Sequence, residues 1–211
     1  MKDPDEDARR FAAEALADGD PTGWFERLYA DPAAIVPWDS RSPHPLLVEW
    51  AATWKGSGRA LVVGCGLGDD AEFVAGLGYA TTAFDVSDSA VRQAKDRWPG
   101  TSVHYQAADI FDPPQEWYQA FDLVVEIMTV QALPEDLHPA ATAAVRDFVA
   151  PGGALLVICS AREEGGEVYA PPWPLTPAEI AAFGTDGLVA ERVEDLRGDG
   201  RHRARAVFRR R

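Results

Sequence analysis

The sequence has 211 residues, of which 46% are hydrophobic and 26% are charged, and its formal net charge is -14. A chain of this length and apolar content can bury the core of one domain but is short for two. Its negative charge repels phosphate backbones and anionic membrane surfaces, so we expect neither nucleic acid nor a membrane as a partner.

Residues 1–55 are predicted to form a helical cap and a loop that precede an α/β core at 56–211, all within one domain. Acidic residues early in the segment and a closing glycine predict a helix over 3–18, and further helices are expected over 21–30 and 45–54. Prolines in "DPAAIVPWDSRSPHP" (31–45) exclude a regular element, so this stretch is predicted to be a loop.

From Arg59 onward, short apolar runs alternate with amphipathic stretches, which predicts a parallel sheet covered by helices on both faces. The expected strands are 60–63, 79–84, 102–105, 121–127 and 153–159, and the expected helices are 69–77, 87–97, 134–149 and 176–183. "LVAERVED" and "RARAVFRR" flank the turn "RGDG" and predict an antiparallel hairpin at the sheet edge. The fold class is therefore α/β, with seven mostly parallel strands.

The only basic cluster lies at the C-terminus, where Arg203, Arg205 and Arg209 alternate with small or apolar residues. A period of two predicts a half-buried edge strand with solvated arginines. The alternative is an anion-binding tail.

Two cysteines, Cys65 and Cys159, lack metal-ligand spacing and a nearby histidine, so we expect reduced thiols and no metal. The N-terminus is acidic where a signal peptide is basic, and no apolar run reaches the roughly 18 residues that span a bilayer. These features predict a cytoplasmic location.

The stretch "ALVVGCGLGDDAEF" (60–73) places a glycine turn after the first strand of the core, where parallel sheets bind ligands. Asp85 at the next strand end can accept hydrogen bonds from ribose hydroxyls. Both features suit NAD as well, because "GLGDDA" matches a dinucleotide pattern. Asp109, after the third strand, is placed to accept from an adenine amine, and no Tyr-x-x-x-Lys pair of a short-chain dehydrogenase is present.

Taken in order, "GCGLG", "AFDVS", "AADIFD", "FDLVVE" and "APGGALLV" resemble the class I S-adenosylmethionine-dependent methyltransferases over 59–160. The resemblance implies a Rossmann-like sheet and S-adenosylmethionine as the methyl donor. Val62 departs from the family pattern, which often has Asp or Glu there.

A narrower resemblance is carried by "PWDSRSPHPLLVEW" upstream and "EEGGEVYAPPWPLTPAEI" downstream. Both are similar to segments of the thiopurine and thiol/halide methyltransferase group, in which an apolar residue commonly replaces the acid at the position of Val62. This group implies a small, soft acceptor such as a thiol.

The resemblance implies that the glycine turn contacts the methionine part of the donor, that Asp85 holds the ribose and that Asp109 flanks the adenine. Glu126 is expected beneath the sulfonium. The residues expected to contact the donor are Trp38, Gly64, Cys65, Gly66, Gly68, Asp85, Val86, Asp109, Ile110 and Glu126. The alternatives are that Asp109 only begins a turn, that Asp88 rather than Asp85 is the polar cap, and that Glu126 is solvated.

Trp38 could cover the donor sulfonium by a cation–π contact of about 1 kcal/mol, or pack with Trp24 and Trp54. Trp173 is expected near the acceptor or as a loop anchor. His44 is the histidine that we would test as a general base, although a thiol acceptor needs none.

The expected function is methyl transfer to a small-molecule acceptor whose identity the sequence leaves open. The alternatives are methylation of an oxygen or nitrogen atom of a small metabolite, a non-catalytic donor-binding domain, and an NAD-dependent oxidoreductase. The oligomeric state is also left open.

Overall fold

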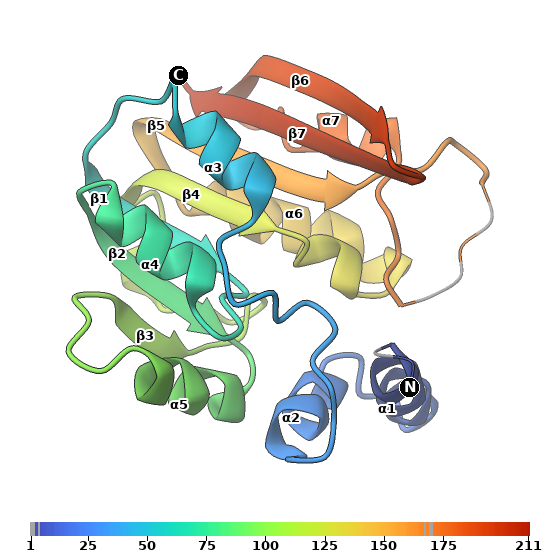
Figure 1. Cartoon of the computed structure of the whole chain (residues 1–211). Helices are drawn as coiled ribbons and strands as arrows, with labels where there is room; N and C mark the ends of the chain where they lie inside the picture. Colours follow the sequence, from blue (N-terminus) through green and yellow to red (C-terminus); the bar gives the residue numbers. More distant parts are fainter. Residues whose placement is uncertain (1–2, 4, 167, 169–170) are drawn as a thin grey trace.

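The computed structural model describes residues 3, 5–166, 168 and 171–211. Its centre is a seven-stranded sheet in the order β3-β2-β1-β4-β5-β7-β6, which confirms the predicted Rossmann-like α/β class (Figure 1). The strands are β1 (Gly58–Val63), β2 (Tyr79–Asp85), β3 (His104–Ala107), β4 (Phe121–Ile127), β5 (Val149–Ser160), β6 (Leu188–Gly198) and β7 (Arg201–Arg210).

Helices cover both faces of the sheet. They are α1 (Glu6–Ala17), α2 (Gly23–Ala30), α3 (Pro45–Ala51), α4 (Asp69–Gly76), α5 (Asp88–Arg97), α6 (His138–Asp147) and α7 (Pro177–Ala182), with short 3-10 helices at Gln115–Trp117, Val130–Ala132 and Glu135–Leu137. Buried side chains of α3, α4 and α5 share one core cluster, whereas those of α6 and α7 share another. No described helix combines the length and apolarity that crossing a membrane requires.

The parallel strands β1, β2, β4 and β5 contribute to both cores because their side chains alternate. In β1, Leu61 and Val63 belong to the cluster of α6 and α7, whereas Ala60 and Val62 belong to the cluster of α3, α4 and α5. Fully apolar runs are what strands buried on both faces require. This explains why these strands could be predicted from the sequence.

The strand order reverses around β1, which pairs in parallel with β2 on one side and β4 on the other. The connections from β1 therefore diverge at its carboxyl end, and ligands of open α/β sheets bind in the crevice that this leaves. The glycine turn begins there, at Gly64.

The C-terminal hairpin forms as predicted, but the position of its second strand in the sheet and the exposure of Arg205 differ from the prediction. β7 lies between β5 and β6, so β6 rather than β7 is the edge strand. Arg205 is only 4% exposed, because its guanidinium pairs with Glu194 at 2.7 Å and with Glu49 at 3.3 Å. The prediction that the arginines of this strand are solvated was wrong for Arg205, whose charge is neutralised by neighbours distant in sequence.

The helix expected over 134–149 is shorter in the structure. A 3-10 turn precedes α6, and β5 already begins at Val149, so "APGG" belongs to the strand rather than to the end of the helix. Val149 pairs with Phe121, and the register then shifts before Ala154 pairs with Leu123. The glycines form this irregularity, with Gly152 at φ +78°.

The N-terminal helices α1 and α2 pack on each other, and α2 is hydrogen-bonded to the core through Glu26 and through Tyr29 O, which accepts from Gln93 Nε2 at 2.7 Å. Glu26 of α2 accepts hydrogen bonds from Ser87 Oγ (2.6 Å), Ser89 N (3.0 Å) and Ser89 Oγ (2.6 Å) at the start of α5. These hydrogen bonds hold the N-terminal helices beside the end of β2, next to Asp85.

Candidate functional site

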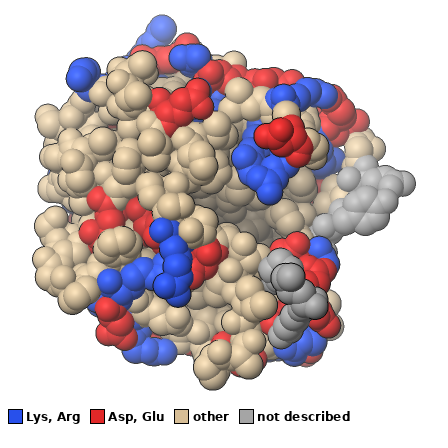
Figure 2. Space-filling model, viewed as in Figure 1, with Lys and Arg blue, Asp and Glu red and all other residues tan. Residues whose placement is uncertain are grey.

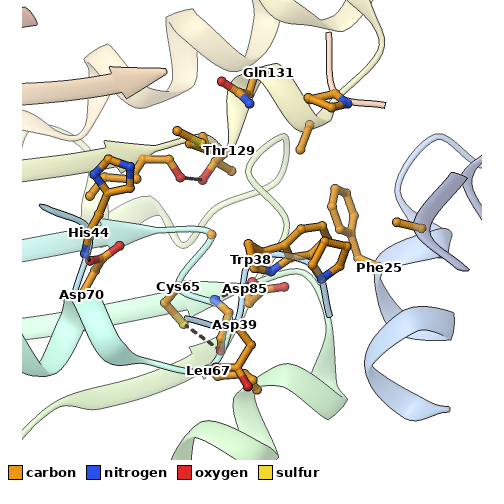
Figure 3. A pocket seen from close by; sticks show the side chains of 18 of the residues that line it. Phe25, Trp38, Asp39, His44, Cys65, Leu67, Asp70, Asp85, Thr129 and Gln131 are labelled. Atoms are coloured by element: carbon orange, nitrogen blue, oxygen red, sulfur yellow. Dashed lines mark hydrogen bonds between the residues drawn. The ribbon is translucent and has the colours of Figure 1, made fainter. Parts of the chain in front are cut away.

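A cavity of about 640 Å³ lies where the carboxyl ends of β1, β2 and β4 face the N-terminal helices. Figure 2 shows the corresponding hollow on this face of the molecule, with basic side chains at its border. In Figure 3, His44 and Phe25 lie at opposite ends of the cavity, with Thr129 between them.

The glycine turn forms one wall of this cavity. Gly64, Gly66 and Gly68 all have positive φ angles, of +60°, +51° and +93°. Gly68 is the N-cap residue of α4, so the turn delivers the chain directly into a helix. A Cβ on Gly66 would lie 2.8 Å from Tyr29 Oη and 3.8 Å from Trp38 Nε1, which shows how closely the cap approaches the turn. The backbone needs glycine here both for its dihedral angles and for space.

Asp85 ends β2 at the cavity and is 6% exposed. Its carboxylate accepts from Gly66 N at 2.9 Å and from Ser87 N at 3.0 Å, and burial raises its pKa. The helix cap of α5 is Ser87, whose Oγ accepts from Ala90 N, whereas Asp88 is exposed. Asp88 is therefore not the cap of this helix, and Asp85 rather than Asp88 lines the cavity.

The loop over 31–45 folds back over the turn. Trp38 Nε1 donates to Tyr29 Oη at 2.7 Å, and its ring meets Trp24 edge to face at a centroid distance of 6.1 Å. Trp38 still lines the cavity and is 47% exposed, so its ring remains accessible to a ligand. Trp54 is elsewhere, stacked on Trp50. Trp38 therefore packs with Trp24, as one expectation had it, but not with Trp54.

The same loop is held by an ion-pair network. Asp39 accepts two hydrogen bonds from the Arg97 guanidinium, at 2.9 and 2.8 Å, and Asp69 accepts a third at 2.9 Å. These contacts hold the pKa of Asp39 below its usual range. The loop, the glycine turn and α5 are thereby joined through one arginine.

Asp109 and Ile110 line the cavity beyond β3, as does Val86. Asp109 Oδ1 also accepts from Phe111 N at 2.9 Å, so this side chain both starts a turn and borders the cavity. Cys65 lines the cavity too, and burial raises the pKa of its thiol. The structure thus brings together nine of the ten residues expected at the donor.

His44 lines the cavity, but its geometry disfavours the expected role of general base. Its Nδ1 accepts from Leu46 N at 3.2 Å at the start of α3. Burial, with the positive charge of Arg203 nearby, lowers the pKa of His44 to about 4. A neutral imidazole that holds a proton so weakly is a poor base at neutral pH.

Glu126 and Trp173 are described residues that do not line the cavity. Glu126 is fully buried, and its Oε1 accepts from Thr129 N at 2.7 Å and Val130 N at 3.0 Å. Neither the expected contact with the donor nor the solvated alternative fits this position. Trp173 donates its backbone N–H to Gln131 O at 2.7 Å, so it anchors the loop. Residues 167, 169 and 170 of the "EEGGEVYAPP" motif lie outside the described residues.

The buried Glu126 gives a pH-dependent prediction. Burial raises its pKa to about 7 from 4.5, so the folded protein binds its proton more tightly than the unfolded chain does. The contribution of Glu126 to stability is therefore fully present at low pH and falls as pH rises from 4.5 through 7, by roughly 1.4 kcal/mol per unit. Because Glu126→Gln cannot ionise, we expect it to gain about 2–3 kcal/mol relative to the wild type between pH 5 and pH 8.

Urea unfolding of both proteins at pH 5, 6, 7 and 8 measures this difference. Glu116→Gln removes an exposed carboxylate and serves as the control, with no expected trend. A constant offset between Glu126→Gln and the wild type across this range would contradict the prediction.

The comparison with known proteins agrees with the site. Residues 60–153 match the family described as a methyltransferase domain. Thiocyanate methyltransferase 1 of Brassica oleracea is 27% identical over 158 residues, which cover 74% of this chain and 67% of that protein. Thiocyanate methyltransferase 1 of Arabidopsis thaliana is 26% identical over 156 residues, which cover 72% and 66%. The chain therefore contains a methyltransferase domain over residues 60–153 and is similar to the thiol methyltransferases. It spans about two thirds of the length of these relatives.

Solved structures agree with this methyltransferase fold. The N-methyltransferase NodS of Bradyrhizobium japonicum, in complex with S-adenosylhomocysteine, matches with a TM-score of 0.66 at 22% identity, covering 90% of this chain and 98% of that one. A structure described by the conversion of a disulfide bond into a thioacetal group during echinomycin biosynthesis matches with a TM-score of 0.72 at 23% identity, covering 90% and 91%.

S-adenosylmethionine is the methyl donor that the similarity to class I methyltransferases implies. The described residues fit such a group, because the cavity joins a buried carboxylate at Asp85 to a turn whose glycines leave no side chain in the way. When bound, S-adenosylmethionine supplies an electrophilic methyl group on a sulfonium.

Sequence reasoning missed several side chains that line the cavity of this methyltransferase. Gln131 and Ser160 meet there, with Ser160 N donating to Gln131 Oε1 at 2.5 Å. Arg201 and Arg203 of β7 also line it. The basic C-terminal cluster was the available signal for the arginines, whereas Gln131 and Ser160 belong to no motif.

Proposed function

We propose that this methyltransferase moves the methyl group of S-adenosylmethionine to the sulfur of a small thiol or to another soft nucleophile. The observation that carries the proposal is the chemistry of the cavity wall. His44 is the one histidine among the described cavity residues, and its pKa is lowered to about 4. A thiol with a pKa near 8.5 is partly thiolate at neutral pH, so it reacts without a strong base.

The residues of the chain would bind, orient and exclude water. We propose that the glycine turn (64–68) holds the methionine part of the donor, that Asp85 and Val86 hold the ribose, and that Asp109 and Ile110 flank the adenine. The Trp38 ring would cover the sulfonium. These residues would align an acceptor thiolate with the methyl group that the donor supplies, whose bonding electron pair would stay with the donor sulfur.

Other features support a small molecule as the partner. The net charge of -14 opposes nucleic acids and anionic membranes. Both cysteines are free and buried, which agrees with a cytoplasmic location. We also propose that residues 1–211 act as one domain, in which 1–55 form the cap, because α2 and the loop are tied to the core by Glu26 and Asp39.

Isothermal titration with S-adenosylhomocysteine, with NAD in parallel, tests donor binding. We expect micromolar affinity for the former and none for the latter. Turnover is then measured with thiols, halides, phenols and amines as acceptors, with release of S-adenosylhomocysteine as the readout. Binding without turnover of any acceptor would indicate a non-catalytic donor-binding protein, and turnover of only phenols or amines would replace the thiol.

A further inference from the structure

His138 is a buried histidine at the start of α6, 1% exposed, and it does not line the cavity. Its Nε2 lies 2.9 Å from Leu133 O, and its Nδ1 lies 2.7 Å from Glu179 Oε1. A carbonyl oxygen can only accept a hydrogen bond, so Nε2 carries a proton. A neutral ring has one N–H group, so the charge of the ring depends on its contact with Glu179.

Glu179 is an ionised carboxylate. Its Oε2 accepts from Thr176 N at 2.7 Å and from Thr176 Oγ1 at 2.9 Å, in the capping box of α7. Partial burial opposes ionisation, but the hydrogen bonds from Thr176 and His138 outweigh it and lower the pKa of Glu179. Because a carboxylate can only accept, Nδ1 of His138 also carries a proton. The ring is therefore an imidazolium inside the protein.

Other charged groups surround this pair without replacing Glu179. Arg162, which follows β5, lies 4.0 Å from the Glu179 carboxylate and pairs with Glu135 of the 3-10 helix before α6 at 2.5 Å. Asp136 of the same 3-10 helix is exposed, and Cys159 of β5 is neutral because burial raises the pKa of its thiol. Among the described residues, the carboxylate in ion-pair contact with His138 is that of Glu179.

The ion pair joins two parts of the cavity wall. The turn at 130–133 and the segment at 171–176 both contribute residues that line the cavity. The turn accepts from the His138 ring through Leu133 O, whereas the segment ends at the cap of α7, where Glu179 lies. The imidazolium therefore holds the two parts together from behind the wall.

We propose that the His138 imidazolium is a proton-controlled link, and that losing its proton as pH rises frees segment 171–176 from the turn at 130–133. A neutral ring keeps one N–H group, so its other nitrogen would direct a lone pair at an oxygen that can only accept. Such an unpaired contact in the interior is costly, so the two parts separate. Because the closed wall binds the proton, the link is complete at low pH and is lost as pH rises.

This inference goes beyond the proposed methyl transfer, and its test needs neither donor nor acceptor. Nitrogen NMR of the histidine rings in the wild type measures the protonation state. At pH 7 we expect both ring nitrogens of His138 to carry protons, whereas the His44 ring, whose Nδ1 accepts from Leu46 N, should carry one. A His138 ring with a single proton at pH 7 would overturn the inference.

Glu179→Gln removes the charge and can keep the hydrogen bonds. Glutamine also completes a capping box, and its amide N–H can donate to Nδ1 of His138. The ring should then be neutral at pH 7, with its proton directed at Leu133 O, and the changed signal identifies His138. Glu135→Gln makes the same charge change on an acid that pairs with Arg162, and it should leave both protons on the ring.

Hydrogen exchange measures the release of segment 171–176. All three of its backbone N–H groups are hydrogen-bonded, Trp173 N to Gln131 O, Leu175 N to Ser160 O and Thr176 N to Glu179. After correction for the intrinsic effect of pH, we expect their exchange in the wild type to rise about 10- to 100-fold from pH 6 to pH 9, as for the loss of a hydrogen bond between charged groups. Glu179→Gln should show no such rise, because its link does not titrate. An equal rise in both proteins, or none in the wild type, would overturn the inference.

Discussion

Asp85→Ala is expected to weaken binding of S-adenosylhomocysteine at least about 100-fold. The carboxylate lines the cavity and orients the glycine turn by accepting from Gly66 N at 2.9 Å. Its removal would lose the proposed contacts with the ribose hydroxyls, and hydrogen bonds to a charged group contribute roughly 1.5–3 kcal/mol each. Two such bonds account for the expected factor.

Isothermal titration measures the effect, and thermal unfolding shows whether the variant still folds. Asp88→Ala is the matched control, because that acid is exposed three residues further along the chain. Asp85→Asn keeps the shape of the side chain but only one accepting oxygen, so its loss should be intermediate. Unchanged affinity in a folded Asp85→Ala protein would show that another residue holds the ribose.

Gly64→Ala is expected to lower the free energy of unfolding by about 2–4 kcal/mol and to abolish donor binding. The new Cβ would lie 2.6 Å from Cγ2 of Thr129 and closer still to its Oγ1, which donates to Val63 O. A φ angle of +60° adds roughly 1 kcal/mol of strain for alanine, and overpacking adds about 1–3 kcal/mol.

Gly78→Ala distinguishes the cost of backbone strain from the cost of overpacking. Gly78 also has a positive φ, of +98°, but a Cβ there would meet no atom within 4 Å. Its cost should therefore be the strain alone, roughly 1–2 kcal/mol, with donor binding retained. Urea unfolding of both variants gives the comparison, and equal losses would show that Thr129 yields without cost.

The regular elements could be predicted because their signals are local. Apolar runs between amphipathic stretches located all five parallel strands, and β4 (Phe121–Ile127) was predicted with its observed bounds. The place of β7 between β5 and β6 could not be predicted, since strand order depends on pairing between distant segments. The burial of Arg205 follows from that order, because its partner Glu49 lies in α3, more than 150 residues away.

The residues of the site also differ in whether their positions could be predicted from the sequence. Asp85 and the glycine turn follow strands directly, so their position at the cavity follows from the sheet. Glu126 also ends a strand, but its side chain turns toward the backbone of Thr129 and Val130, a contact that only the following 3-10 turn creates. Trp173 stands among prolines in a loop whose path the sequence does not determine.

Because β7 is antiparallel, it lines one half of the cavity, so the side chains of that half can change independently of the glycine turn that lines the other half. The donor half depends on glycines and on backbone N–H groups, which tolerate little substitution. The other half is lined by Arg201 and Arg203, which are alternate residues of one strand, so replacing either of them would leave the glycine turn undisturbed. A change in the length of the turn between β6 and β7 would be absorbed by the exposed edge strand β6, because burial fixes the register of β7 against β5. The length of this turn can therefore vary while Arg201 and Arg203 stay at the cavity.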